Sequence, residues 1–246
     1  SIDIYDVTYA NGMFVAVGNY GRLATSPDGI TWTQRTSSFG YAAIYDVTYG
    51  NGMFVAVGDD GKLATSPDGI TWTQRTSSFD STNIRGVTYG NGMFVAVGDD
   101  NKLATSPDGI TWTQRTSSFD SRDDDGYTIH IYDVTYANGM FVAVGNRGKL
   151  ATSPDGITWT KRTSTFDTFY ISEVTYGHGM FVIVGDYGKL ATSPDGITWT
   201  ERSSSFGVAP ISGVAYGNGM FVAVGSKRYG KPDPPYPYGG KVATLS

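Results

Sequence analysis

The chain has 246 residues, a formal net charge of −5 and a pI near 4.9, so it lacks the basic surface that neutralises a nucleic-acid backbone. It contains no cysteine, which excludes disulfides and thiolate metal sites and leaves the cellular compartment open. No run of eighteen apolar residues occurs and no charged, apolar leader follows Ser1, so we expect neither membrane insertion nor a signal peptide. The 33 glycines and 17 tyrosines favour turns and strands over helices.

A repeat of about forty residues runs through the chain. Its segment Gly-Met-Phe-Val recurs six times at a regular step, apart from one longer step in the middle. The six methionines are Met13, Met53, Met93, Met140, Met180 and Met220. A period of this length is typical of propellers and solenoids, in which each repeat is one supersecondary unit.

The second copy illustrates the unit. We expect four strands, at Ile44 to Tyr49, Met53 to Gly58, Lys62 to Thr65 and Ile70 to Arg75. Asn51-Gly52 is a strong hairpin signal between the first two strands, and Ser66-Pro67-Asp68-Gly69 predicts a tight turn between the last two. Taking strict alternation, Ile44 and Thr48 face one way and Tyr45, Val47 and Tyr49 face the other, so both faces carry apolar groups.

A sheet that is apolar on both faces needs a neighbour on each side, and radial stacking about an axis provides this. The sequence therefore predicts an all-β, six-bladed β-propeller forming one domain over residues 1–246. The expected blades span about 1–43, 44–83, 84–130, 131–170, 171–210 and 211–246. The last copy ends after three strands, and only three residues precede the inner strand of the first blade. We therefore expect a three-stranded last blade that the N-terminus does not complete.

The turn Ser66-Pro67-Asp68-Gly69 continues into Ile70-Thr71-Trp72, and five of the six copies carry this run. The run resembles the Asp-box (BNR) repeat of sialidase-like propellers, Ser-x-Asp-x-Gly-x-Thr-Trp, with one residue missing between Asp and Gly. The matching residues are Asp28, Asp68, Asp108, Asp155 and Asp195 with Trp32, Trp72, Trp112, Trp159 and Trp199. The resemblance implies a structural, non-catalytic turn in which Asp binds backbone amides and Trp packs into the blade.

Differences between the copies concentrate in two sets of loops, whereas residues 23–39, 63–79 and 103–119 are identical. Loops after the fourth strands cover residues 40–43, 80–83, 120–130, 167–170 and 207–210. Loops after the second strands cover 19–20, 59–60, 99–101, 146–147, 186–187 and the insert 226–240. Both sets emerge at one end of the ring, which we call the variable mouth. Loops on a rigid scaffold commonly carry binding chemistry, although surface loops also drift without function.

Aromatic and arginine side chains are favoured at recognition surfaces, and the variable mouth contains several. The candidate ligand-binding residues are Tyr41, Arg85, Arg122, Tyr127, His130, Arg147, Tyr170, Tyr187, Arg228, Tyr229, Tyr236 and Tyr238. The proline-rich run at 232–238 would either present its tyrosines or cap the unfinished sixth blade.

Catalytic and metal sites have weaker support. The arginine cluster implied by a sialidase resemblance has no match, because Arg35, Arg75, Arg115, Arg162 and Arg202 occur once per copy on the outer strand. The inner-strand acids Asp6, Asp46, Asp133 and Glu173 would form either a carboxylate pair or cation ring, or local hydrogen bonds, which we favour. The acidic run 120–126 lacks calcium-loop spacing, because Ser121 stands where an acid is required. We expect no enzyme activity, no cofactor and no metal.

Two functions remain. The first is a carbohydrate-binding, lectin-like propeller that uses the variable mouth. The alternative is a protein-binding or structural repeat scaffold, natural or made by blade amplification, with no small-molecule site. The expected partner is therefore a glycan or a protein, with no nucleic acid, and the open edge of the sixth blade allows self-association. Exposure of the five tryptophans would distinguish stacking platforms from core residues.

Overall fold

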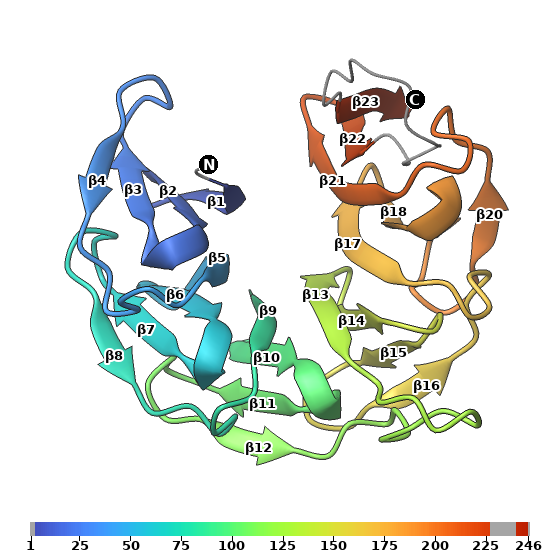
Figure 1. Cartoon of the computed structure of the whole chain (residues 1–246), viewed down its shortest axis with the longest axis horizontal. Helices are drawn as coiled ribbons and strands as arrows, with labels where there is room; N and C mark the ends of the chain where they lie inside the picture. Colours follow the sequence, from blue (N-terminus) through green and yellow to red (C-terminus); the bar gives the residue numbers. More distant parts are fainter. Residues whose placement is uncertain (1–2, 227–239, 246) are drawn as a thin grey trace, which may run out of the picture.

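The computed structural model describes residues 3–226 and 240–245. Six small antiparallel sheets stand around an axis as the blades of a β-propeller, and Figure 1 shows blades 1 and 6 at the two ends of a horseshoe. In each blade the first strand lies nearest the axis and the last strand lies at the rim. The predicted fold class is confirmed. Among the described residues there is no helix with the length and hydrophobicity that a membrane crossing needs.

The strands of the six blades are as follows. Blade 1 has β1 (Ile4–Ala10), β2 (Met13–Gly18), β3 (Leu23–Ser26) and β4 (Thr33–Arg35). Blade 2 has β5 (Ile44–Gly50), β6 (Met53–Gly58), β7 (Leu63–Ser66) and β8 (Thr73–Arg75). Blade 3 has β9 (Ile84–Gly90), β10 (Met93–Gly98), β11 (Leu103–Ser106) and β12 (Thr113–Arg115). Blade 4 has β13 (Ile131–Ala137), β14 (Met140–Gly145), β15 (Leu150–Ser153) and β16 (Thr160–Arg162).

Blade 5 has β17 (Ile171–Gly177), β18 (Met180–Gly185), β19 (Leu190–Ser193) and β20 (Thr200–Arg202). Blade 6 has β21 (Ile211–Gly217), β22 (Met220–Ser226) and β23 (Gly240–Leu245), so the expected three-stranded last blade is confirmed. Short 3-10 segments follow the second strand in four blades: η1 (Asn19–Gly21), η2 (Asp59–Gly61), η3 (Asp99–Asn101) and η4 (Asp186–Gly188).

The hairpins between first and second strands form as their sequence predicts. Asn51 and Gly52 both have positive φ, of 47° and 77°, which is the backbone geometry that Asn-Gly pairs adopt in two-residue hairpins. His178 takes the same position in blade 5 with φ of 47°. It is therefore a turn residue there.

Five hydrophobic clusters hold the blades together, and each lies between two neighbouring blades. Between blades 1 and 2, Val15 and Leu23 of blade 1 pack against Ile44, Val47 and Phe54 of blade 2. The same positions recur in the clusters between blades 2 and 3, 3 and 4, 4 and 5, and 5 and 6. Among the described residues no such cluster joins blade 6 to blade 1.

The inner strands depart from the alternation expected of them. Each carries a register shift near its start, and in blade 2 Ile44 pairs with Gly58 while Asp46 pairs with Val57. Tyr45 is thus an extra residue, as in a β-bulge. Because of the bulge, Ile44 and Val47 enter the same inter-blade cluster, although strict alternation places them on opposite faces.

The Ser-Pro-Asp-Gly turn is held by its own side chains. The Ser66 hydroxyl accepts the Gly69 N–H at 2.8 Å and donates to the Asp68 carboxylate at 2.9 Å. Asp68 also accepts the N–H groups of Ile70 and Thr71, at 2.8 and 2.9 Å. These backbone donors, Thr71 first, hold the pKa of Asp68 below its ordinary value. The same bonds recur in the other four turns.

The fourth strand begins later than expected. Residues 70 and 71 are held by the Asp68 carboxylate, so β8 starts at Thr73 and not at Ile70. The outer strand is consequently only three residues long in each complete blade.

Substitution of Ser66 by alanine tests the turn. Ser66 is fully buried and holds the Gly69 N–H, so Ser66→Ala should lower the free energy of unfolding by about 1–2 kcal/mol. Ser78→Ala in the same blade is the matched control, because the buried Ser78 hydroxyl makes no hydrogen bond within the described residues. Urea denaturation of both variants measures the difference, and equal losses would contradict this account of the turn.

Candidate functional site

The loops of the variable mouth contact one another between blades. The Asp59 N–H, at the end of β6, donates to the Ala43 carbonyl in the loop after β4, at 3.0 Å. The Asp99 N–H makes the equivalent bond to Asn83 at 3.0 Å, and the Asp186 N–H bonds to Tyr170 at 3.1 Å. The inner strands begin directly after these contacts. Their first residues therefore lie at the variable mouth.

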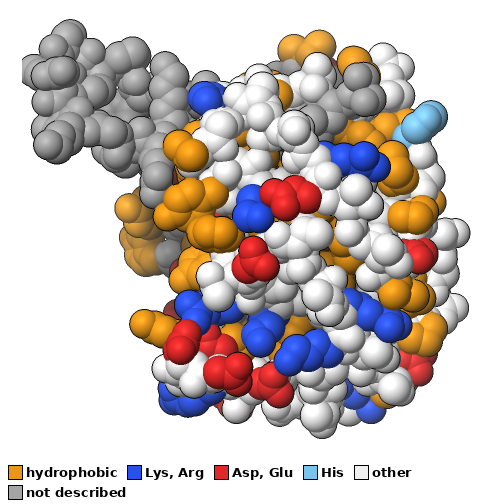
Figure 2. Space-filling model, turned by 90° about the vertical axis from the view of Figure 1, so that its right-hand side faces the viewer, with side chains coloured by type: hydrophobic (Ala, Val, Ile, Leu, Met, Phe, Trp, Pro, Cys, Tyr) orange, Lys and Arg blue, Asp and Glu red, His pale blue; other side chains and the backbone are white. Residues whose placement is uncertain are grey.

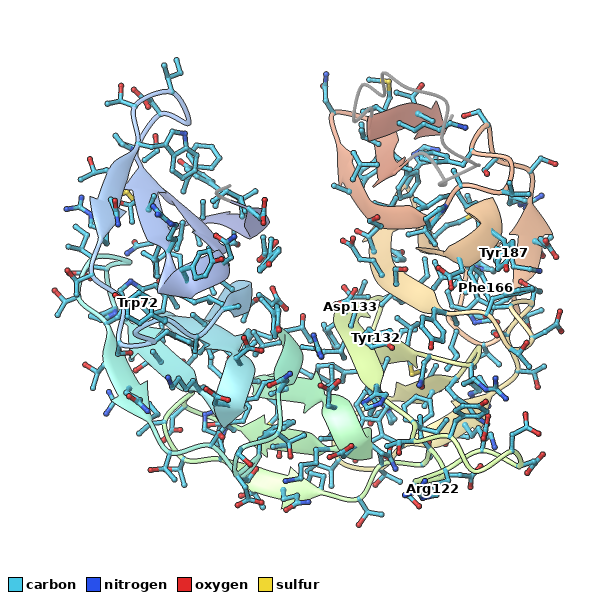
Figure 3. All side chains as sticks on the ribbon, in the orientation of Figure 1. Trp72, Arg122, Tyr132, Asp133, Phe166 and Tyr187 are labelled. Atoms are coloured by element: carbon cyan, nitrogen blue, oxygen red, sulfur yellow. The ribbon has the colours of Figure 1, made fainter. Side chains whose placement is uncertain are left out.

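A cavity of about 160 Å³ lies on the axis at this end. It is lined by Tyr5, Asp6, Tyr45, Asp46, Arg85, Tyr132, Asp133, Ser172 and Glu173, which come from the starts of β1, β5, β9, β13 and β17. Figure 3 labels Tyr132 and Asp133 on β13, on the inner side of the ring. We call this space the axial cavity.

The acids of the axial cavity bind the inner strand of the next blade. Asp6 accepts the Val47 N–H at 3.0 Å, and Asp46 accepts the Val87 N–H at 2.6 Å. Asp133 and Glu173 accept the N–H groups of Val174 and Val214 in the same way, at 2.8 and 3.0 Å. The local hydrogen bonding favoured from the sequence is thus present, and it forms a ladder that links consecutive blades at the axis.

Glycine interrupts this ladder in blades 3 and 6, where Gly86 and Gly213 replace the acid. A Cβ at Gly86 would lie 3.2 Å from the Cα of Asp133, so the inner strands of blades 3 and 4 approach closely there. With no acid in blade 3, the Val134 N–H bonds to Oδ1 of Asp133 in its own strand, at 2.7 Å. Asp133 therefore serves two backbone donors.

Proton affinity is raised at three of these carboxyls. Loss of hydration, followed by the nearby carboxyl of Asp6, raises the pKa of Asp46 well above its ordinary value. Loss of hydration raises the pKa of Asp133 to about 6, although two backbone N–H groups oppose the shift. The pKa of Glu173 is raised to about 8, first by lost hydration and then by the charge of Asp133. Perturbed groups gathered in a cavity are a common mark of a functional site.

Aromatic rings and two basic side chains surround the entrance to the axial cavity. We call Tyr5, Tyr45, Arg85, His130, Tyr132 and Tyr170 the girdle. The guanidinium of Arg85 lies 4.7 Å from the ring centroid of Tyr45, whose ring is 5.7 Å from that of Tyr5. On the other side, the rings of His130 and Tyr132 stack at 6.4 Å, and Tyr132 lies 5.9 Å from Tyr170.

Asp99 fixes the centre of the girdle. It binds Arg85 through two nitrogens, at 3.0 and 2.7 Å, and its carboxylate lies 3.1 Å from Nδ1 of His130. The Tyr45 hydroxyl donates to Asp59 at 2.5 Å. Burial raises the pKa of Tyr45 and of Tyr132 to about 12, so both phenols are neutral at physiological pH.

The structure brings together only some of the residues predicted for the site. Arg85, His130 and Tyr170 are members of the girdle, and Arg85 lies in β9 and not in a loop. Tyr41 is 90% exposed in the loop after β4, and Tyr187 contacts Phe169 at 4.6 Å. Arg228, Tyr229, Tyr236 and Tyr238 lie outside the described residues.

Three other predicted residues form a separate cluster, in which Arg147 of the loop after β14 contacts the insert 120–130 that contains Arg122 and Tyr127. Arg147 binds Asp123 and Asp125, at 2.5 Å in each case, and its guanidinium lies 4.8 Å from the ring of Tyr127. Arg122 donates to the Gly126 carbonyl at 2.7 Å. Arginines therefore hold the acidic insert to itself and to the loop after β14, and Figure 3 shows Arg122 nearer the rim of the ring than Tyr132 of the girdle.

Sequence reasoning missed Tyr5, Tyr45 and Tyr132, because they lie inside predicted strands. A signal was nevertheless present at the second position of each inner strand, where otherwise similar copies differ. That position holds Tyr5, Tyr45, Arg85, Tyr132, Ser172 and Ser212. It is the bulge position, so its side chain is directed by the bulge and not by regular strand alternation.

The repeated tryptophans and arginines have structural contacts. Trp159 and Trp199 are each 8% exposed and belong to inter-blade clusters, as do the half-buried Trp72 and Trp112. Trp32 of blade 1 is 41% exposed. Each once-per-blade arginine donates from Nε to a threonine of the neighbouring strand, at 2.9 or 3.0 Å. Trp159 and Trp199 are thus core residues, and Trp72 and Trp112 pack against the core.

Away from the axis the surface is mixed in charge. Figure 2, which faces the right-hand side of Figure 1 with blades 4 to 6, has Lys, Arg, Asp and Glu side chains interspersed over the described residues. A groove of about 580 Å³ lies at the rim of blade 2 and is lined mainly by polar groups, among them Lys62, Gln74 and Arg75. The groove contains no aromatic ring in its lining, in contrast to the axial cavity.

No protein-family model and no curated protein sequence matches the chain. Solved structures do. YCF48 from Cyanidioschyzon merolae is similar at 18% identity and a TM-score of 0.69, over 91% of this chain and 79% of that one. Virginiamycin B lyase from Staphylococcus aureus is similar at 13% identity and a TM-score of 0.77, over 89% and 76% of the two chains. A structure titled YCF48 bound to D1 peptide matches at 15% identity and a TM-score of 0.50, over 92% and 89%. These similarities show the fold.

The prediction that this chain is not an enzyme is contradicted by the structural comparisons. The fold neighbours include lyases, at 13% and 11% identity, so a propeller of this shape can carry catalysis. The missing arginine cluster excludes only the sialidase arrangement. Catalysis on other residues is not excluded by that argument.

The raised pKa values predict how stability depends on pH. The folded chain holds protons on Asp46, Asp133 and Glu173 that the unfolded chain releases from about pH 4 upwards. The free energy of unfolding should therefore fall as pH rises from about 4.5 to about 8, the folded pKa of Glu173. Glu173→Gln keeps an acceptor for the Val214 N–H but cannot ionise.

This variant should reduce the fall in stability between pH 5 and pH 8 by at least about 1 kcal/mol, the equivalent of roughly one pKa unit. Urea denaturation at several pH values measures the effect. Glu201→Gln, at an exposed surface ion pair, is the control and should leave the pH dependence unchanged. An unchanged slope in Glu173→Gln would contradict the assignment.

Proposed function

We propose that this chain is a binding propeller that recognises a protein partner at the variable mouth, with a basic side chain of the partner entering the axial cavity. The girdle carries the proposal. Tyrosine and arginine are favoured at recognition sites, and here four tyrosines and an arginine surround one opening at the end of the ring where the copies differ.

The size of the axial cavity supports a side chain as its occupant. Small-molecule pockets usually measure roughly 300 to 1,000 Å³. The axial cavity, at about 160 Å³, is smaller than that range and suits one inserted side chain. The peptide complex of YCF48 supports a protein partner by analogy of fold alone.

The chemistry of the lining supports a cationic group. Asp46, Asp133 and Glu173 have raised pKa values because they lose hydration and lie near other carboxyls. A lysine ammonium or arginine guanidinium placed among them would favour their ionised forms. The exposed ring of Tyr5 at the entrance adds cation–π attraction, whereas the ring of Tyr45 is already in contact with Arg85, whose charge is paired with Asp99.

A carbohydrate ligand is the second candidate. Tyr5 is 49% exposed and Tyr170 is 45% exposed, so their rings are accessible for stacking on a sugar at the variable mouth. Binding in the grooves between blades has less support, because four of the five tryptophans are in inter-blade clusters. We also propose that the Ser-Pro-Asp-Gly turns are shortened Asp-boxes with a structural role, on the basis of their hydrogen bonds to backbone amides.

A peptide with one central lysine and blocked ends, such as Gly-Gly-Lys-Gly-Gly carrying a fluorophore, tests the protein-partner proposal. Fluorescence anisotropy should show binding that tightens at least tenfold from pH 5 to pH 8, because the carboxyls then lose their protons. Glu173→Gln should weaken binding at pH 8 at least tenfold. Glu201→Gln should not, which separates the axial cavity from general attraction to an acidic protein.

The same peptide with norleucine in place of lysine should not bind. Equal binding of both peptides, or no binding of the lysine peptide at any pH, would overturn the proposed cationic occupant. A glycan array then tests the second candidate: binding to a defined glycan that is lost in Tyr170→Ala would favour the carbohydrate function, and a blank array would remove it.

A further inference from the structure

Blade 1 exposes an apolar face that every other blade buries. Ile4, Val7 and Tyr9 of β1 are 54%, 54% and 58% exposed. The equivalent isoleucines of the other five blades, Ile44, Ile84, Ile131, Ile171 and Ile211, are all 0% exposed. The equivalent valines, Val47, Val87, Val134, Val174 and Val214, are each 3% exposed. The face of β1 therefore has the residues of an inter-blade cluster without the preceding blade.

Blade 6 exposes the opposite half of the same kind of cluster. Val224 of β22 is 45% exposed and Val242 of β23 is 70% exposed. Their counterparts in blade 1, Val17 and Leu23, are 0% and 1% exposed because blade 2 covers them. Blade 6 thus lacks a following blade in the described residues.

One glycine shows what blade 6 is shaped to receive. A Cβ at Gly50 would lie only 2.0 Å from Cγ of Tyr89, because the tyrosine ring of the next blade sits directly on that glycine. Gly90 and Gly177 receive the tyrosines of blades 4 and 6 in the same way. At the equivalent Gly217 no described atom of a neighbouring strand would lie within 4 Å of an added Cβ. The position where the tyrosine of a following blade would pack, which we call the tyrosine seat, is therefore open in blade 6.

We propose that a second copy of this chain docks head to tail, with its blade 1 on blade 6 of the first copy and its Tyr9 on Gly217. At each existing junction, the first-strand face of the next blade packs on the side that is open in blade 6. On this chain β1 exposes such a first-strand face. The new junction continues the five that already exist, with the same residue types at each position.

The interface uses two different faces, so it is heterologous, and such contacts produce rings or open chains of subunits. This differs from pairing of the open β23 edge, which was the route to self-association expected from the sequence. Edge pairing joins backbones and needs neither Tyr9 nor Gly217. The two modes therefore respond to different substitutions.

Sedimentation velocity over a hundredfold range of protein concentration should show wild-type chains associating as concentration rises. Gly217→Leu fills the tyrosine seat and should weaken association at least tenfold. Because no described atom lies near Gly217, this variant should unfold at the same temperature as the wild type. Gly217→Ala is the matched control and should still associate, since Ala10 and Ala137 occupy the same position in existing junctions.

Mixing two blocked variants gives the decisive result. Gly217→Leu retains the face of blade 1, whereas Tyr9→Lys retains the face of blade 6, so each should be monomeric alone. Together they should form a dimer with one copy of each, identified by native mass spectrometry. Val242→Lys replaces Gly217→Leu if the latter does not fold.

Three outcomes would overturn the proposal. A wild-type chain that stays monomeric at every concentration would mean that blades 6 and 1 of one chain meet, or that neither face binds a copy. Association that survives in both single variants would assign it to the β23 edge. A mixture that remains monomeric would show that the faces of blades 1 and 6 do not fit each other.

Discussion

Burial of apolar side chains between neighbouring blades is the interaction on which this structure depends. A single four-stranded blade is apolar on both faces, so it buries neither face alone. Val15 and Leu23 become inaccessible only when Ile44 and Val47 of the next blade cover them. Each fully buried side chain of this kind contributes roughly 1.5–3 kcal/mol. The sheets supply hydrogen bonding within a blade, but the ring exists because of its junctions.

The axial ladder connects these junctions to the candidate site. Every inner strand is an edge strand, with backbone N–H groups that no further strand accepts, and unpaired polar groups are costly when buried. Asp46 and Glu173 accept backbone N–H groups of the next blade, and their carboxyls lose part of their hydration in doing so. The same four acids thus join blades and line the axial cavity, and three of them, Asp46, Asp133 and Glu173, acquire raised proton affinity. At these positions the structural role cannot be separated from the proposed recognition role.

Repeat period and turn chemistry made most of the fold predictable. The Asn51-Gly52 hairpin, the six copies and the three-stranded last blade all follow from local signals. The site was less accessible to sequence reasoning because the bulge at Tyr45 breaks the two-residue period of β5. A strand with apolar residues on both faces gives no indication of where its extra residue points. Pairing of Arg85 with Asp99 also depends on the distance between an inner strand and a loop, which spacing in the sequence does not encode.

The sameness of the junctions has a consequence for how such a chain can change. Since residues 23–39, 63–79 and 103–119 are identical, the third strand, the turn and the outer strand of one of these blades offer its neighbour nothing that marks its place in the order. In-frame gain or loss of one whole unit would recreate packing that already exists, and no new complementary surface would have to arise. Copy number is then a variable that recombination can alter in single steps. The composition of the mouth changes separately, through the few loop and bulge positions that differ from unit to unit.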